Sequence, residues 1–231
     1  MGDKMSTFRS KIMEKLYIVI PAYNEEMNIT SVAREWHTVV ETISEDSKLV
    51  IIDDGSKDST YQVLTELSKE LPQLEVITKK NSGHGATVLY GYRYALEQNA
   101  DYIFQTDSDG QTLPEEFYGF WELRDKYSAV IGYRNHRKDG FSRVFVTKTF
   151  KFVLWCIFKL NITDANTPFR LLNRDVLQRH ISKIPKDFNL SNVMLTICLV
   201  KYKENIRFIP ITFKPRQGGV NSINFKKIVK I

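Results

Sequence analysis

Two carboxylates stand two residues apart near the middle of the chain, at Asp107 and Asp109, and Gln111 adds an amide oxygen at the same spacing. In an extended segment, side chains two residues apart point the same way. Carboxylate and amide oxygens are the hard ligands that Mg²⁺ and Mn²⁺ prefer. The pattern therefore predicts a divalent cation at these three residues. The alternative interpretation is an Asx turn that leads into the next helix.

Further acidic side chains follow two other short apolar runs of the sequence. Glu25 follows the first run, and Asp53 and Asp54 follow the second, ahead of a glycine and Ser56. Carboxylates that meet at one place repel each other unless a cation or hydrogen-bond donors lie nearby. Asp53 is placed to accept a hydrogen bond from the N–H of a nucleobase. Asp54 or Ser56 is expected to cap the turn and the following helix.

A glycine-containing segment, residues 81–85, follows a third apolar run and reads Asn-Ser-Gly-His-Gly. Gly83 and Gly85 permit close approach of another group to the backbone at the start of a helix. Their spacing matches neither the dinucleotide-binding fingerprint nor a phosphate-binding P-loop. His84 is expected to be a solvated loop residue, because the sequence offers no His or Cys partner at metal-binding spacing.

The elements that must position these residues alternate between strands and helices. Short apolar runs predict strands at Leu16–Ala22, Lys48–Asp53, Leu74–Thr78 and Tyr102–Thr106. Amphipathic periodicity predicts helices at residues 29–43, from Asp58 or Ser59 to Pro72, at Gly83–Asn99, and at Glu115–Tyr127 after Pro114. This alternation predicts a mainly parallel sheet with right-handed crossovers. Ligands of such sheets bind beyond the carboxyl ends of the strands, where the acidic side chains lie.

The second half of the chain breaks this rhythm. The pattern predicts a strand at Ala129–Gly132, a basic loop at 133–143, a long apolar and basic helix at Arg143–Leu160, helices near Arg174–Ile184 and Leu190–Lys201, and a strand at Ile206–Phe213. Residues 1–14 have the composition of a disordered leader without a signal peptide. We therefore expect one α/β domain over residues 15–231.

Composition excludes several classes of protein. The chain has 231 residues, of which 42% are hydrophobic and 26% charged, which excludes a disordered chain, a disulfide-stapled miniprotein and a polytopic membrane protein. The net charge is +6, but residues 1–110 are acidic and residues 111–231 are basic. Cys156 and Cys198 lie in apolar runs and are expected to be buried free thiols. A nucleic-acid-binding module is disfavoured, since aromatic side chains do not interleave with the basic loop.

Four segments in order, residues 21–25, 51–56, 81–91 and 107–111, resemble the motifs of family 2 inverting glycosyltransferases, whose fold is the nucleotide-sugar-binding GT-A type. The second half is similar to the dolichol- and polyprenol-phosphate mannosyltransferase branch of that family. Residues 132–134 resemble its Gly-Ser-Arg, residues 164–170 its Asp-x-x-(Ser/Thr)-Gly-Phe-Arg, and Arg216 with Gly219 and Ser222 its Arg-x-x-Gly-x-Ser. Tyr133 replaces the usual Ser, and Pro168 the usual Gly.

The resemblance implies a donor site in residues 15–111 and an acceptor site in residues 112–231. It implies a GDP- or UDP-sugar donor and a Mg²⁺ or Mn²⁺ cofactor bound by Asp107, Asp109 and Gln111. It further implies that Asp109, Arg134 and Arg170 take part in the reaction. The nucleotide sugar would be bound by Pro21, Tyr23, Glu25, Asp53, Gly83 and Asp107.

Arginines indicate which acceptor the second half receives, because guanidinium groups suit phosphate oxygens. Within the matched motifs and the basic loop, the residues predicted to bind the phosphate of a polyprenyl phosphate are Arg134, Arg143, Arg170 and Arg216. The alternative acceptor is a sugar or protein hydroxyl, for which Asp164 is the candidate base. Residues 145–160 suit a lipid chain or an anionic membrane surface, which predicts a cytoplasmic protein, peripheral at the cytoplasmic face of a membrane, or else they form a core helix.

Overall fold

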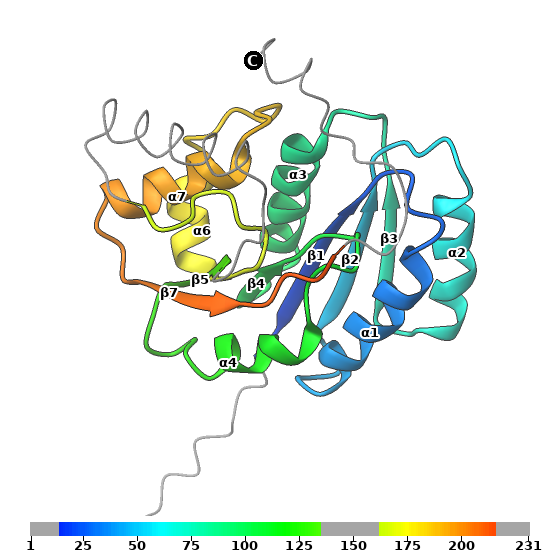
Figure 1. The fold of residues 1–231 in the computed structure, drawn as a ribbon, viewed down its shortest axis with the longest axis horizontal. Coiled ribbons are helices and arrows are strands. Elements are labelled where there is room, and N and C mark those ends of the chain that lie inside the picture. Colours follow the sequence, from blue (N-terminus) through cyan, green and yellow to red (C-terminus); the bar gives the residue numbers. More distant parts are fainter. Residues whose placement is uncertain (1–13, 135–161, 216–231) are drawn as a thin grey trace, which may run out of the picture.

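A seven-stranded sheet forms the centre of the computed structural model, which describes residues 14–134 and 162–215 (Figure 1). The strand order is β3-β2-β1-β4-β6-β5-β7. The first four strands in sequence, β1 to β4, pair in parallel, and so do β5 and β7. The strands are β1 Leu16–Ala22, β2 Lys48–Asp53, β3 Leu74–Thr78, β4 Tyr102–Gln105, β5 Ala129–Arg134, β6 Arg170–Asn173 and β7 Ile206–Ile211.

This architecture confirms the predicted single α/β domain with a mainly parallel sheet. One strand, β6, was absent from the sequence-based expectation, and it runs antiparallel to both β4 and β5. It has four residues, Arg-Leu-Leu-Asn, without a β-branched side chain or a measurable alternation. Such a short strand has no sequence signal, because its formation depends on its two neighbours in the sheet.

Helices cover both faces of the sheet (Figure 1). The residues of α1, α2 and α4 pack with one set of strand side chains, and those of α3, α6 and α7 pack with the other set. Side chains of β1 alternate between the two cores, with Ile18 on the first side and Val19 on the second. The helices are α1 Ile29–Glu41, α2 Thr60–Glu70, α3 His84–Glu97, the 3₁₀ turn η1 Pro114–Glu116, α4 Phe117–Trp121, α6 Arg174–Ile181 and α7 Ser191–Lys201.

The helix predicted at Glu115–Tyr127 is replaced by η1 and the shorter α4. After Trp121 the backbone continues in tighter turns, in which the N–H of Leu123 donates to the carbonyl of Phe120 and that of Arg124 to Trp121. These bonds span three residues, as in a 3₁₀ helix. The helix predicted near Arg174–Ile184 likewise ends at Ile181, ahead of Pro185.

Several predictions concern residues that the structure does not describe. These are the leader, the basic loop beyond Arg134, the helix Arg143–Leu160 with Cys156, and the segment after residue 215. Cys198 is a buried free thiol, as predicted. Among the described residues, none of the helices combines the length and the apolar character that crossing a membrane requires.

Candidate functional site

One edge of the sheet collects the predicted functional residues. The carboxyl ends of β1, β2, β3 and β4 lie there because these strands are parallel. Since β6 is antiparallel to both β4 and β5, the amino end of β6 and the carboxyl end of β5 lie at the same edge. The Asp107 loop, Arg134 and Arg170 therefore lie at the same edge of the sheet. The sequence predicted such a meeting for the loops that follow β1, β2, β3 and β4.

The loop after β4 carries the predicted metal ligands. Asp107 is about one quarter exposed, and the Oδ1 of Asp109 accepts a hydrogen bond from the N–H of Gln111 at 3.1 Å. That bond is the Asx turn of the alternative interpretation, and it uses one carboxylate oxygen. The amide nitrogen of Gln111 donates to the carbonyl of Lys214 at 2.8 Å. This bond does not involve the amide oxygen, which is the atom predicted to bind the cation. The turn thus orients the loop without excluding a cation.

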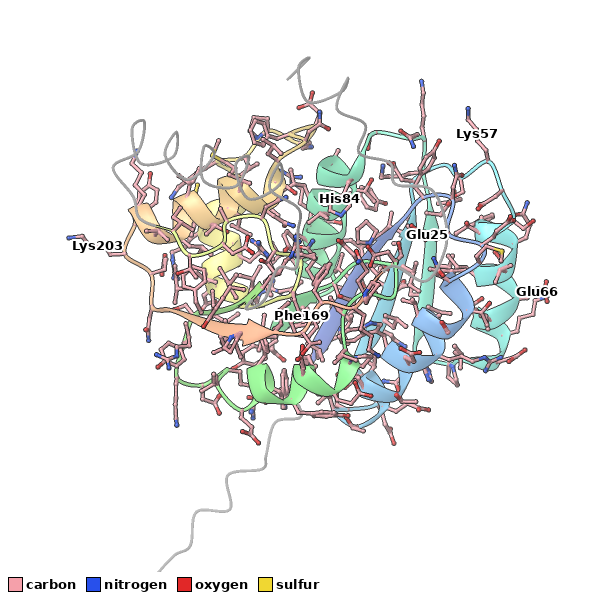
Figure 2. The ribbon with its side chains drawn as sticks, viewed as in Figure 1. Glu25, Lys57, Glu66, His84, Phe169 and Lys203 are labelled. Carbon is pink, nitrogen blue, oxygen red and sulfur yellow. The ribbon has the colours of Figure 1, made fainter. Side chains whose placement is uncertain are left out.

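The side chain of His84 is about half exposed, as predicted for a solvated residue, but the residue begins a helix and does not lie in a loop. It is the first residue of α3, and its Nε2 lies 2.9 Å from the Oδ1 of Asp107 (Figure 2). Desolvation lowers the pKa of His84, but the carboxylates of Asp107, Asp109 and Asp54 raise it further than that, so the net pKa is raised. Acidic groups from two loops therefore act on this histidine, as expected if the carboxylates at the strand ends lie near one another.

Asp54 fixes the loop between β3 and α3. Its carboxylate accepts hydrogen bonds from the backbone N–H of Ser82 at 2.9 Å and of Gly83 at 2.8 Å, and it pairs with Lys79. The side chain of Asn81 donates to the carbonyl of Asp54 at 2.8 Å. Asp54 therefore anchors this loop. The prediction that Asp54 caps α2 is wrong, because Asp58 accepts the hydrogen bond from the N–H of Thr60, the first residue of that helix.

The side chain of Asp53 is buried at the end of β2. One oxygen accepts from the N–H of Ser56 at 3.1 Å, and the other from the hydroxyl of Thr78 at 2.8 Å. Each carboxylate oxygen has a second lone pair. The predicted hydrogen bond between Asp53 and a nucleobase stays a prediction, and the two protein donors hold the carboxylate rigid at the strand end.

The loop after β1 is tied to the loop after β2. The N–H of Asn24 donates to the hydroxyl of Ser56 at 2.9 Å, and the N–H of Glu25 donates to the hydroxyl of Thr60 at 2.8 Å. Glu25 is buried and its Oε2 accepts from the side chain of Asn28 at 3.0 Å. Pro21 lies within β1, and Tyr23 is exposed just beyond it. Tyr23 and Glu25 (Figure 2) thus lie on a loop that is braced by the residues after β2.

Gly83 and Gly85, at the start of α3, each occupy a position where a larger residue would not fit, for different reasons. Gly83 has a φ of +90°, which side chains rarely adopt, and a Cβ there would lie 3.1 Å from the Oδ1 of Asn189. A Cβ on Gly85 would lie 2.2 Å from the carbonyl oxygen of Asn189 and 2.4 Å from that of Phe188. The close approach predicted at Gly85 is therefore made by residues 188–189 of this chain. Sequence reasoning missed Asn189, because no motif marks it.

On the second half, the described acceptor candidates are Arg134, Asp164 and Arg170. The guanidinium of Arg134, at the end of β5, lies over the ring of Phe213 at 4.3 Å. Asp164 accepts from the N–H of Asn166 at 3.2 Å. The other two predicted phosphate ligands, Arg143 and Arg216, lie outside the described residues.

Arg170 differs from its predicted role. It is fully buried, and its three nitrogens donate to protein oxygens: Nε and Nη2 to the carbonyl of Thr167, and Nη1 to Asn192 and Thr196. A guanidinium that contacts an acceptor phosphate must face the ligand. This arrangement argues against the predicted phosphate contact and places Arg170 inside the protein beneath the site.

The side-chain oxygens at this edge of the sheet fit a divalent cation that also takes ligands from a substrate. Within residues 14–134 and 162–215, no group of three or more His, Cys, Asp or Glu side chains could hold a metal alone. Two carboxylates and an amide oxygen suit a cation such as Mg²⁺ or Mn²⁺, which usually keeps waters and substrate phosphates as further ligands. The arrangement can therefore bind an anionic, metal-associated ligand between the first and second halves of the chain.

Comparisons with known proteins agree with this geometry. The model of the family described as "Glycosyl transferase family 2" matches residues 17–181. A Salmonella choleraesuis protein named undecaprenyl-phosphate 4-deoxy-4-formamido-L-arabinose transferase is 22% identical over 227 residues, which cover 97% of this chain and 67% of the relative. The protein of the same name from Pseudomonas fluorescens is 23% identical, with 93% and 62% covered. The chain spans about two thirds of the length of these relatives.

Among solved structures, a glucosyl-3-phosphoglycerate synthase from Mycobacterium tuberculosis, in complex with Mn²⁺, UDP-glucose and phosphoglyceric acid, superimposes with a TM-score of 0.62. The sequence identity is 15%, and the match covers 90% of this chain and 73% of that one. At this identity the likeness shows a shared fold, and it confirms the GT-A architecture predicted from the sequence.

Proposed function

The chain belongs to glycosyl transferase family 2, and on that premise we propose that it moves a sugar from a nucleoside diphosphate to a polyprenyl phosphate, with inversion at the sugar. The observation that carries the proposal is the shared sheet edge, where the loop with Asp107 and Asp109 follows β4 and where Arg134 ends β5. The relatives named above as undecaprenyl-phosphate transferases support this acceptor class.

On the donor side, residues 15–111 bind the nucleotide sugar. Tyr23 is exposed beside the braced loops, so its ring is available to stack on a base, while Pro21 and Glu25 shape the wall of the pocket. Asp53, held by Ser56 and Thr78, presents its remaining lone pairs to the base. A UDP-sugar is the donor we propose to test first, with a GDP-sugar as the alternative.

Asp107, Asp109 and the amide oxygen of Gln111 would hold Mg²⁺ or Mn²⁺ against the donor diphosphate. When bound, the cation offsets the negative charge that develops on the departing nucleoside diphosphate. The side chains themselves orient the loop: Asp109 holds the Asx turn, and the bond from Gln111 to Lys214 ties the loop to the segment that follows β7.

On the acceptor side, residues 112–231 receive the lipid phosphate. Among the described residues, Arg134 is the proposed phosphate ligand, and Arg143 and Arg216 are proposed from their motifs. A phosphate oxygen of the acceptor forms a bond to C1 of the sugar while the bond from C1 to the donor phosphate breaks, so no proton has to be removed. A site for an anionic nucleophile therefore needs positively charged side chains to bind it and needs no carboxylate to act as a base.

We further propose that the enzyme works as a peripheral protein at the cytoplasmic face of a membrane. Residues 111–231 carry the basic excess of the chain. Basic side chains near an anionic bilayer surface contribute on the order of 1 kcal/mol each to binding. Binding to vesicles that contain anionic lipid, and its loss in high salt, tests this location.

Turnover assays test the acceptor directly. The protein is incubated with UDP- or GDP-sugars, Mn²⁺ and undecaprenyl phosphate, and release of the nucleoside diphosphate is measured together with the glycolipid. We expect release that requires all three components and a product whose sugar–phosphate bond has the opposite anomeric configuration to the donor. Turnover with a glycan acceptor and none with the lipid phosphate, for every donor, contradicts the proposal.

A substitution of Asp164 separates the two acceptor classes. If the acceptor is a phosphate, Asp164→Asn keeps the bond to the N–H of Asn166 and retains turnover within about threefold, because no base is needed. If the acceptor is a hydroxyl, loss of the base lowers kcat by about 10²–10⁴ with little change in donor affinity. Steady-state kinetics with both substrates varied distinguishes these results, and Asp175→Asn on α6 is the control.

A further inference from the structure

Arg170 is fully buried, and among the described residues its guanidinium makes no hydrogen bond to a carboxylate. Its guanidinium donates to the carbonyl of Thr167 through Nε at 3.0 Å and Nη2 at 2.5 Å. Nη1 lies 3.2 Å from the carbonyl oxygen of Asn192 and 3.3 Å from the hydroxyl of Thr196. Burial lowers the pKa of Arg170. One side chain thus connects the loop before β6 to the first turns of α7.

Thr196 closes this connection from the other side. Its hydroxyl lies 2.8 Å from the carbonyl oxygen of Asn192, one turn earlier in α7, and 3.1 Å from that of Ala165, so its one proton is shared between the two. The Nη2 of Arg170 lies 3.5 Å from the carbonyl oxygen of Ala165. The side chains of Arg170 and Thr196 therefore bond two carbonyls of the loop, those of Ala165 and Thr167. Asp164 precedes them directly, and its position follows from theirs.

The connection lies directly under the reaction edge. Arg170 is the antiparallel partner of Gln105, the last residue of β4, and Asp107 follows two residues later. Phe169 and Leu171 pack into the core with α1 and α4, so the alternation along β6 turns Arg170 to the other face, where it bonds α7. The carboxylates of Asp164 and Asp107 both interact electrostatically with the guanidinium. Because Arg170 pairs with Gln105, the residues before β6 and the Asp107 loop after β4 lie at the same end of two adjacent strands.

The surroundings of Arg170 are not optimised for stability. Within the described part of the chain, the buried Oγ1 of Thr167, Oδ1 of Asn192 and Nε2 of Gln105 have no hydrogen-bond partner. Buried polar groups without partners and buried charges without counterions are both costly. A fold that keeps such a group next to a site gains a fixed geometry from it, as polar networks in interiors do.

We propose that Arg170 is a positioning residue: it fixes the backbone of residues 164–167 as the acceptor-side wall of the site and makes no contact with the acceptor phosphate. That this wall borders the acceptor rests on the proposed function. That Arg170 fixes residues 164–167 can be tested without any substrate. Asp164 and Asn166 are the side chains that the held loop presents beside the donor.

The test uses two variants, because Arg170→Lys can fail to fold. Lysine keeps a charge but lacks the fork that reaches Thr167 and α7 together. Thr196→Val is nearly isosteric and removes the hydroxyl that holds the loop at Ala165. Thr65→Val on α2 is the matched control, since the Thr65 hydroxyl also bonds a carbonyl one turn earlier, that of Tyr61 at 2.8 Å, but contacts no loop of the site.

Hydrogen exchange of residues 162–169, UDP affinity with Mn²⁺, and kinetics are measured for each variant. We expect exchange on the order of tenfold faster in Arg170→Lys and Thr196→Val. We expect kcat to fall by about 10²-fold in Arg170→Lys, because a displaced wall misorients the substrates, with KM for the lipid phosphate within about threefold. UDP affinity and the Thr65→Val control stay at the wild-type value.

The opposite pattern overturns the inference. If Arg170 contacts the phosphate directly, Arg170→Lys raises KM for the lipid phosphate strongly and leaves hydrogen exchange of residues 162–169 unchanged. Thr196→Val then changes neither exchange nor kinetics. Unchanged exchange in both variants overturns it as well, whatever the kinetics. If the wild-type protein has no activity with polyprenyl phosphate, the proposed function fails, while the exchange data still decide whether Arg170 holds residues 164–167.

Discussion

Asp109→Asn is expected to abolish Mn²⁺-dependent binding of the nucleotide sugar and to lower kcat by about 10³ or more, since it removes one charge from the proposed cation site. Asparagine keeps an oxygen that can accept the bond from the N–H of Gln111, so the Asx turn survives. The folded structure therefore remains while the charge is lost. Calorimetry with Mn²⁺ and UDP, and separately with UDP alone, measures the effect.

Two companion variants make this result specific. Asp109→Ala removes the turn as well as the charge, so a larger loss of stability in Ala than in Asn shows that the two functions of the side chain are distinct. Asp125→Asn is the control, because this aspartate is mostly exposed and contacts the hydroxyl of Tyr102, at the opposite end of β4. Unchanged Mn²⁺ affinity in Asp109→Asn contradicts the metal assignment.

The first half of the fold could be predicted closely because its signals are local. The apolar runs of β1, β2 and β3 end at the predicted residues, each at a charge or a turn former. The same local signals failed at β6, whose four residues form a strand only because β4 and β5 flank them. The helix after Pro114 was predicted too long, because local patterns do not show where α-helical bonds give way to 3₁₀ turns.

The candidate site divides in the same way. Asp107, Asp109 and Asp53 were predicted at the sheet edge because the carboxyl ends of parallel strands meet there. The partners of these groups were not predictable. Neither the bond from His84 to Asp107 nor the position of Asn189 beside Gly83 follows from spacing along the chain. Arg170 was expected to face a ligand because its residue type suits phosphate, and its burial and its bonds to carbonyls could not be predicted from the residue type.

Gly85→Ala is expected to destabilise the protein by about 3 kcal/mol, at the upper end of what overpacking usually costs. The added Cβ would lie 2.2 Å from the carbonyl oxygen of Asn189 and 2.4 Å from that of Phe188, and both are backbone atoms that cannot rotate away. Either residues 188–189 or the first turn of α3 must move. For a domain of this size the melting temperature should fall by roughly 10 °C.

The same displacement should reach the site, because His84 precedes Gly85 and contacts Asp107. We therefore expect weaker binding of UDP and Mn²⁺ at a temperature where the variant is still folded. Gly119→Ala is the matched control: it also adds one methyl group to a helix, α4, but a Cβ there meets nothing within 4 Å, so it should stabilise the protein slightly. A Gly85→Ala variant that melts with the wild-type protein would show that the contact between residues 188–189 and α3 is looser than described, and that the acceptor half does not brace the start of α3.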